Sequence, residues 1–383
     1  MTLDPLSPAS TPTAATTLTY REAGVDYALI DPLKIAAQRA ASATSTHLGR
    51  HGFAEVAASR GESAYVVDVG PFYLASIVEC LGSKALIADE MQRLTGRSYY
   101  AEIAQDTIAM AINDLITVGA TPLVVQAYWA AGGSDWFGDA QRAEALVAGW
   151  KRACDICQVA WGGGETPALA GIVADGRIDL AASCTGVVSP KTRLSLGDAL
   201  DAGDAIVLFA STGIHANGVS LARKLAARLP QGYLTELPTA NGRISYGEAL
   251  LAPTALYSPV TEALHAAGIT PHYCANITGH GWRKLLRHPA AWRYRVRSTG
   301  EVPAVLQFVC EQAGLDPRAA YGTFNMGAGF ALFVDADAVE RTLEIATAQG
   351  VHAWHAGQVE TGPKELIIEP LGITYSSQEL QLR

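Results

Sequence analysis

One apolar segment carries polar residues that a buried helix tolerates only when they have partners. Residues 106–123 read DTIAMAINDLITVGATPL, in which Asp106, Asn113 and Asp114 interrupt the apolar run. Burying such groups costs free energy unless something satisfies them. Seven residues apart, Asp106 and Asn113 are expected on one helix face, roughly 10 Å from each other. They suit a magnesium–phosphate or adenosine site. The structural alternative makes Asp106 a helix N-cap and the others satisfied polar groups at a helix end.

A second candidate is the glycine-rich stretch GGGETP at 162–167. Without side chains, its glycines let the backbone approach a ligand closely. Glu165 and Thr166 then supply a carboxylate and a hydroxyl group beside that backbone. The alternative is a flexible turn that binds nothing.

The third candidate, STGIHANG at 211–218, lies between an apolar run and an amphipathic one. A loop from a buried strand into a helix presents backbone N–H groups to an anion. His215 could transfer a proton near neutral pH, and Asn217 could orient a substrate amide. A purely structural histidine is the alternative.

Two further loops resemble the third in composition. ITGHGWRKLLR (277–287) places glycines before an expected helix with Arg283, Lys284 and Arg287, which would bind a second phosphate or form a solvated basic face. TFNMGAGF (323–330) places Thr323 and Asn325 before an apolar strand. The chain contains neither a phosphate-loop NTPase motif nor a dinucleotide-binding fingerprint.

Strands and helices must hold these loops, and hydrophobic periodicity predicts where they lie. The expected helices are 27–43, 106–118, 139–157, 219–229 and 337–350, and the expected strands are 64–69, 74–80, 178–188, 205–210, 329–335 and 351–359. This alternation favours α/β or α+β layering. We expect a disordered tail at 1–18, one domain at 19–188 and a second at 189–383.

Composition limits the possible partners. The 383 residues are 49% hydrophobic and carry a net charge of −9, which disfavours a nucleic-acid partner because no basic excess is available for phosphates. The chain has no apolar run of membrane-spanning length and no signal peptide, so a cytoplasmic protein without a membrane partner is expected. The six cysteines lack the paired spacing of a zinc site.

The order of the loops is more specific than any one of them. YREAGVD (20–26), AINDL, GGET, HANG and TFNMG occur in succession. From about Tyr20 to Glu369 the chain resembles the aminoimidazole ribonucleotide synthetase (phosphoribosylformylglycinamidine cyclo-ligase) family, more than thiamine-monophosphate kinase, selenophosphate synthetase or the carbamoyl-dehydrating hydrogenase maturation protein. That family uses ATP to close the imidazole ring of formylglycinamidine ribonucleotide, giving aminoimidazole ribonucleotide, ADP and phosphate.

The resemblance implies an α/β (α+β) fold with an N-terminal β-rich, ATP-binding dimerisation domain and a C-terminal α/β domain. It also implies a homodimer, a phosphorylated small-molecule substrate, and ATP with Mg²⁺ as cofactors. The implied catalytic residues are Lys84, Asp106, His215 and Asn217. The implied ATP-binding residues are Glu79, Gly82, Ser83, Lys84, Asp106, Asn113, Asp114, Gly163, Gly164, Glu165 and Thr166, with Glu79 and Asp106 on the metal. The implied substrate-binding residues are Ser211, Thr212, Gly213, His215, Asn217, Thr278, Gly279 and Asn325.

The chain departs from the family pattern at several ligand loops. HLGRHGF stands where the family has a glycine-rich phosphate cover, and ECLGSK (79–84) stands where it has D-G-V-G-T-K. His280 interrupts a glycine run, Asn276 replaces a histidine, and Leu169-Ala170-Gly171 replaces M-P-G. Lost glycines restrict close backbone approach. A paralogue that activates another amide or carboxylate, or a catalytically weakened nucleotide-binding homologue, therefore remains an alternative.

Overall fold

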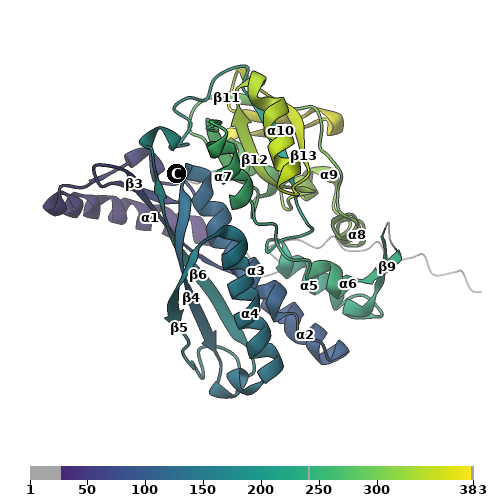
Figure 1. Cartoon of the computed structure of the whole chain (residues 1–383). Coiled ribbons are helices and arrows are strands. Elements are labelled where there is room, and N and C mark those ends of the chain that lie inside the picture. Colours follow the sequence, from purple (N-terminus) through teal and green to yellow (C-terminus); the bar gives the residue numbers. More distant parts are fainter. Residues whose placement is uncertain (1–26, 240–241, 381–383) are drawn as a thin grey trace, which may run out of the picture.

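The computed structural model describes residues 27–239 and 242–380 and contains a large sheet in each half of the chain (Figure 1). The expected tail at 1–18 and the YREAGVD motif at 20–26 lie outside these residues. No helix in the described ranges is long and apolar enough to cross a membrane.

The N-terminal half builds a six-stranded sheet in the order β1-β2-β3-β6-β4-β5, antiparallel except between β4 and β5. Its elements are α1 (Tyr27–Thr44), β1 (Ala54–Glu55), β2 (Tyr65–Asp68), β3 (Tyr73–Cys80), α2 (Ala85–Thr95), α3 (Tyr100–Leu115), β4 (Thr121–Ala131), α4 (Ala140–Cys157), β5 (Ala160–Glu165) and β6 (Ile178–Val188). Strict alternation of buried residues along β6 shows that only one face of the sheet meets the core.

Helix α3 is the central element of the N-terminal half. It packs on β3 and β6 and beside α4, and it also contacts β10 (Tyr273–Asn276) of the C-terminal half. Gly149 permits the close approach of α4, because a Cβ atom there would lie 2.4 Å from the Ala101 carbonyl oxygen. A helix enclosed on so many sides must be apolar around its circumference. The helix begins at Tyr100, so the N-cap alternative for Asp106 is wrong.

The C-terminal half builds a seven-stranded sheet in the order β10-β12-β7-β13-β11-β14-β15, in which only β11 and β14 are parallel. Besides β10, its elements are β7 (Ala205–Ala210), α5 (Val219–Ala226), β8 (Glu236–Thr239), β9 (Gly242–Ser245), α6 (Tyr246–Leu250), α7 (Ser258–Ala266), β11 (Trp292–Val296), α8 (Ala304–Ala313), α9 (Pro317–Tyr321), β12 (Ala328–Val334), α10 (Val339–Ala348), β13 (Ala353–Thr361), β14 (Glu365–Ile368) and β15 (Ile373–Ser376). Strand β12, which lies inside the sheet between β10 and β7, is buried at every residue, and this explains its uninterrupted apolar sequence.

The predicted fold class is confirmed, and the antiparallel pairing makes α+β the better of the two labels. One local prediction is wrong. GGGETP is not a free loop, because residues 160–165 form edge strand β5 and pair with β4. The helix expected after ITGHG is a short 3-10 helix, Gly281–Leu286, with Arg287 at its C-terminal cap.

The two halves share one hydrophobic core and touch through several helices. Helix α7 contacts both α4 and β4, and α2 contacts α6. The N-terminal sheet has one face packed against α3 and an opposite face that is exposed. On this opposite face, the side chains of Ser76, Val78 and Cys80 of β3 all point to solvent. One face of this sheet is therefore left uncovered by the described chain.

Candidate functional site

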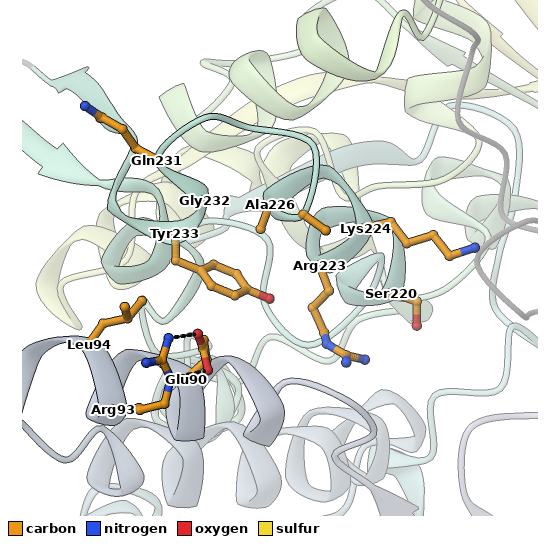
Figure 2. Close-up of a pocket in the computed structure, with 11 residues that line it drawn as sticks. Glu90, Arg93, Leu94, Ser220, Arg223, Lys224, Ala226, Gln231, Gly232 and Tyr233 are labelled. Carbon is orange, nitrogen blue, oxygen red and sulfur yellow. Dashed lines mark hydrogen bonds and ion pairs between the residues drawn. The ribbon is translucent and has the colours of Figure 1, made fainter.

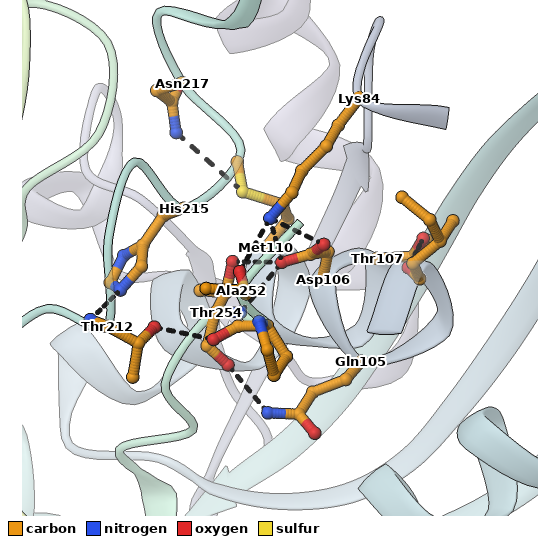
Figure 3. Close-up of polar contacts among 12 residues, drawn as sticks. Lys84, Gln105, Asp106, Thr107, Met110, Thr212, His215, Asn217, Ala252 and Thr254 are labelled. Atoms are coloured by element: carbon orange, nitrogen blue, oxygen red, sulfur yellow. Dashed lines mark hydrogen bonds and ion pairs between the residues drawn. The ribbon is translucent and has the colours of Figure 1, made fainter. Parts of the chain in front are cut away.

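The polar residues of α3 lie where the two halves of the chain meet, and a buried ion pair is their first feature (Figure 3). The Lys84 Nζ atom lies 2.9 Å from Asp106 Oδ1 and donates a second hydrogen bond to the Ala252 carbonyl oxygen at 3.0 Å. Both side chains are 0% exposed. Burial raises the pKa of Asp106 and lowers that of Lys84, while the charge of each partner opposes the shift of the other.

The same Asp106 carboxylate fixes the chain at Thr254. Its Oδ1 atom accepts hydrogen bonds from the Thr254 backbone N–H at 2.8 Å and from the Thr254 hydroxyl group. Residues 252–257 contain no helix or strand until Ser258. Their polar backbone groups therefore depend on side chains from the other half.

Asn113 and Asp114 make comparable contacts farther along α3. Asn113 Nδ2 donates to the Ala255 carbonyl oxygen at 2.8 Å, and its Oδ1 accepts from the Tyr257 N–H at 3.1 Å. Asp114 Oδ1 accepts from Asn276 Nδ2 at 2.7 Å. The polar groups of α3 are thus satisfied by hydrogen bonds to the C-terminal half, which offset the cost of burying them.

Glu79 belongs to a second charged cluster. Burial, and then the charge of Asp114, raise the pKa of Glu79 to about 7, while Lys284 and Arg287 oppose this shift. Burial lowers the pKa of Lys284 to about 8, opposed by Asp114 and Glu79. The structure thus groups Glu79 with Asp114, whereas the expected metal pair was Glu79 with Asp106. Asp106 is committed instead to Lys84 and Thr254.

The basic residues after ITGHG do not form a solvated face. Lys284 is half-buried beside the two carboxylates. The Arg287 side chain is 11% exposed and donates to the Gly61 carbonyl oxygen and to Ser63 Oγ. That alternative is wrong, because the 3-10 helix turns these side chains toward the interior.

His215 occupies a left-handed backbone position with φ 58° and is buried. Its Nε2 atom accepts a hydrogen bond from the Thr212 N–H at 3.1 Å, which leaves the ring proton on Nδ1. Burial, and then the charge of Lys84, lower the pKa of His215 to about 3. The expected proton transfer near neutral pH does not fit this geometry, whereas hydrogen-bond donation from a neutral ring does.

Hydrogen bonds join the loop at 211–218 to two other predicted loops. Asn217 Oδ1 accepts from the Gly279 N–H at 3.0 Å. Asn325 accepts from Ser211 Oγ at 2.9 Å and donates to the Gly213 carbonyl oxygen at 2.8 Å. Five of the expected substrate-binding residues thus take part in two hydrogen-bonded groups, which the backbone of the 211–218 loop joins into one network. Their mutual bonds engage much of their polar capacity.

Two further expected substrate-binding residues lie beside this network. Thr212 donates to the Pro253 carbonyl oxygen at 2.6 Å and so reaches the segment that Asp106 holds. Thr278 is half-buried in the turn that precedes the 3-10 helix. The loops at 211–218 and 276–281 therefore meet near the end of α3.

The remaining expected ATP-binding residues lie at one end of the N-terminal sheet. Gly82 adopts a left-handed turn, and Ser83 Oγ lies 3.4 Å from Ser220 Oγ of α5. Gly163, Gly164, Glu165 and Thr166 are at the exposed end of β5 or just beyond it. Strand pairing places Glu165 level with Cys80, with β4 and β6 between them, about 14 Å away.

Two residues near the site, Thr254 and Arg223, carry no signal in the sequence. Thr254 lies in LLAPTALYS, where a single hydroxyl group gives no signal for a contact with a residue 148 positions earlier. Arg223 lies on α5, where the helical pattern explains a surface arginine without a ligand. Only the packing of the two halves reveals their surroundings.

The two domains of one family match successive parts of the chain. Residues 61–188 match the AIR synthase related protein N-terminal domain, and residues 201–369 match the C-terminal domain of the same family. Solved structures resemble the fold at low identity. A ThiL protein in complex with AMPPCP and TMP has a TM-score of 0.55 at 14% identity, covering 82% of this chain and 90% of that one. Hydrogenase maturation protein HypE has a TM-score of 0.56 at 18% identity, covering 80% and 88%.

Sequence relatives extend over nearly the whole chain. A phosphoribosylformylglycinamidine cyclo-ligase of Carboxydothermus hydrogenoformans is 32% identical over 358 residues, covering 92% of this chain and 98% of that protein. The enzyme of that name from Methanothermobacter thermautotrophicus is 33% identical over 354 residues, covering 92% and 97%. The resemblance read from the motifs is confirmed, and the chain belongs to the phosphoribosylformylglycinamidine cyclo-ligase family.

Proposed function

We propose that the protein closes the imidazole ring of formylglycinamidine ribonucleotide at the expense of ATP, releasing aminoimidazole ribonucleotide, ADP and phosphate. The observation that carries this proposal is the match to cyclo-ligases over 92% of this chain and 98% of one relative. The amide oxygen receives the terminal phosphoryl group of ATP, and the amidine nitrogen attacks the amide carbon. Phosphate then leaves with that oxygen, which solves the problem that an amide oxygen is a poor leaving group.

The Glu79–Asp114 cluster fits a magnesium ion. Burial and the charge of Asp114 together raise the pKa of Glu79 to about 7, and a bound cation would relieve this repulsion. When bound, Mg²⁺ would neutralise the phosphate charge of ATP. Lys284 lies beside the same carboxylates and would contact a phosphate oxygen. We assign Glu79 and Asp114, rather than Asp106, to the metal.

Lys84 and Asp106 act on this proposal as positioning residues. Their ion pair holds residues 252–254 against α3, and Thr212 binds the same segment through Pro253. Thr212 in turn holds the His215 ring. The pair therefore sets the position of the loop that would meet the reacting amide.

His215 and Asn217 are proposed to contact that amide. The neutral His215 ring can donate a hydrogen bond from Nδ1 without losing a proton. Gly329 lets the ring lie against β12, since a Cβ atom there would be 2.6 Å from His215 Cε1. Hydrogen bonding and orientation, rather than proton transfer by His215, are then the contributions of this loop.

A homodimer would cover the open face of the N-terminal sheet. Strand pairing places Val78 of β3 and Gln126 of β4 at the same level on that face. Cys80 and Tyr128 lie on the same face, two residues farther along these strands. Val78 is 70% exposed, although it is apolar and lies in a central part of the sheet. A second copy of the chain is the proposed partner, because it would present the same apolar surface in return.

The first test measures aminoimidazole ribonucleotide with the purified chain, Mg²⁺–ATP and formylglycinamidine ribonucleotide. ADP release without the nucleotide is the background. Product that depends on both substrates would establish the reaction. A folded protein that binds ATP but forms no product would favour a paralogue acting on another amide, which the altered ECLGSK and TGHG loops make the second candidate.

A further inference from the structure

A large cavity lies between the two halves, beside the candidate site but outside all the predicted loops (Figure 2). It is bounded by α2 on one side, and by α5 and the 3-10 helix Gly232–Leu234 on the other. Its volume is about 640 Å³. That is within the range of about 300–1,000 Å³ typical of small-molecule sites.

The charges that line the cavity are mainly positive. Arg93 is neutralised by Glu90, with which it forms an ion pair at 2.6 Å. Arg223 and Lys224 form no ion pair with any residue within 27–239 or 242–380. Both line the cavity, so the charge at this position is positive, whereas the net charge of the whole chain is −9. An anionic ligand would be attracted to this position.

Arg223 is the cation best placed to bind such a ligand. In Figure 2 its guanidinium group extends from α5 toward α2, and the Tyr233 hydroxyl group points toward it. Lys224 also lines the cavity, but its side chain extends away from Tyr233. A guanidinium group next to a phenol offers several N–H and O–H donors to the oxygens of one phosphate group.

Helix α5 connects the cavity to the candidate site. Ser220 of α5 lines the cavity, and its hydroxyl group contacts Ser83 of the ECLGSK loop. Ser220 and Lys224 are one helical turn apart and about 6 Å from each other along the axis. The helix begins at Val219, directly after the loop that holds His215 and Asn217. A ligand anchored at Arg223 can therefore extend toward that loop.

We propose that this cavity binds the phosphate ester of the substrate, with Arg223 as its principal contact and Lys224 as a second cation. The proposal rests on the proposed function, because it assumes that the group acted on at the 211–218 loop belongs to a phosphorylated small molecule. It adds to that function a specificity determinant: the site selects phosphate esters over the corresponding free sugars.

The test uses ribose 5-phosphate as a probe and ribose as its uncharged counterpart, with binding to the full chain measured by calorimetry in a phosphate-free buffer. Wild type is expected to bind ribose 5-phosphate at least tenfold more tightly than ribose. Arg223→Gln is expected to weaken ribose 5-phosphate binding about 10- to 100-fold, in line with the loss of charge-assisted hydrogen bonds. Arg223→Lys should recover part of the affinity because it restores the charge.

Lys151→Gln is the matched control, because Lys151 is an exposed cation of α4 that is paired with Asp155 outside the cavity. It should bind ribose 5-phosphate as wild type does. Thermal unfolding of each variant confirms that the fold is intact. Equal binding of ribose 5-phosphate by Arg223→Gln and wild type, or no preference for ribose 5-phosphate over ribose, would overturn the proposal.

Steady-state kinetics separates this proposal from the proposed function. If wild type forms product, Arg223→Gln should raise KM for formylglycinamidine ribonucleotide at least tenfold and leave KM for ATP unchanged. An unchanged nucleotide KM would overturn the phosphate site but leave the reaction established. If wild type forms no product yet binds ribose 5-phosphate in an Arg223-dependent manner, the proposed reaction fails and the phosphate site stands.

Discussion

Lys84 and Asp106 form an ion pair that no solvent reaches, and the same two side chains hold the backbone of the opposite half of the chain. Lys84 donates to the Ala252 carbonyl oxygen, and Asp106 accepts from the Thr254 N–H. A buried pair of this kind is not in itself strong evidence of stabilisation, because desolvation offsets much of the Coulomb attraction. Its specific effect is to fix residues 252–254, which have no regular structure of their own.

Removing one member of this pair should cost more stability than removing both. Asp106→Ala leaves a buried ammonium group without its partner, for which we expect a loss of about 3–5 kcal/mol in the free energy of unfolding. The double variant Lys84→Met/Asp106→Leu should be less destabilised than Asp106→Ala. Urea unfolding of the single and double variants measures the difference. Additive losses would show that the two charges do not interact.

His215 should remain neutral throughout the physiological range. Its folded pKa of about 3 lies below the ordinary value of 6.5, so protonation favours the unfolded chain. Its contribution to stability is therefore complete above about pH 6.5 and decreases as the pH falls toward 3. Nitrogen-15 spectra of histidine-labelled protein should show a neutral ring with the proton on Nδ1 at pH 5, assigned by comparison with His215→Ala. A His215 titration between pH 6 and 7 would contradict the geometry described here.

Glu79→Gln should weaken magnesium binding. Replacing one of two carboxylates that interact electrostatically removes an oxygen ligand and its charge, so the Mg²⁺ concentration for half-maximal binding of AMPPCP should rise about tenfold or more. In wild type, magnesium affinity should increase as the pH rises through about 7, because the cation competes with the proton of Glu79. Calorimetry at pH 6 and pH 8 measures both effects.

Glu79→Asp is the control for this prediction. It keeps the carboxylate and shortens the side chain by one methylene, so it should retain most of the affinity that Glu79→Gln loses. Asp106→Asn, if it folds, should leave magnesium affinity close to that of wild type. A larger loss in Asp106→Asn than in Glu79→Gln would restore Asp106 as the metal ligand.

Val78→Lys should convert the proposed dimer to a monomer. The side chain is 70% exposed on the open face of the N-terminal sheet, where two copies would bring like charges together. Light scattering after size-exclusion chromatography gives the mass directly. Leu371→Lys changes an exposed leucine elsewhere and should leave the mass unchanged. A wild-type mass near 40.3 kDa would show that the open face does not pair two copies at that concentration.

The elements could be predicted from the sequence where the pattern was regular. The apolar run 205–210 is strand β7, and the helical periodicity of 139–157 is α4 from Ala140 to Cys157. GGGETP was mistaken for a loop because glycine has low strand propensity, whereas pairing with β4 overrides that local preference. The secondary structure of this segment is therefore set by its pairing with a neighbouring strand and not by its own sequence.

The candidate site could be predicted only in part, for a similar reason. Spacing along α3 correctly singled out Asp106, Asn113 and Asp114 as unusual, but spacing could not identify their partners. Asp106 binds Thr254, which is 148 positions away, and Asp114 binds Asn276, which is 162 positions away. Contacts between distant segments follow from the docking of two sheets and leave no local trace in the sequence.

The hydrogen bonds from α3 to residues 252–257 also limit how the two halves can evolve. A chimera that joined residues 1–188 of this chain to the C-terminal half of a distant relative would place Asp106 and Asn113 opposite a foreign loop. Unless that loop offered matching N–H and carbonyl groups, the buried carboxylate and amide would lose their partners. We therefore expect the two halves to be inherited together. Recombination between them should be selected against, although each half has its own sheet.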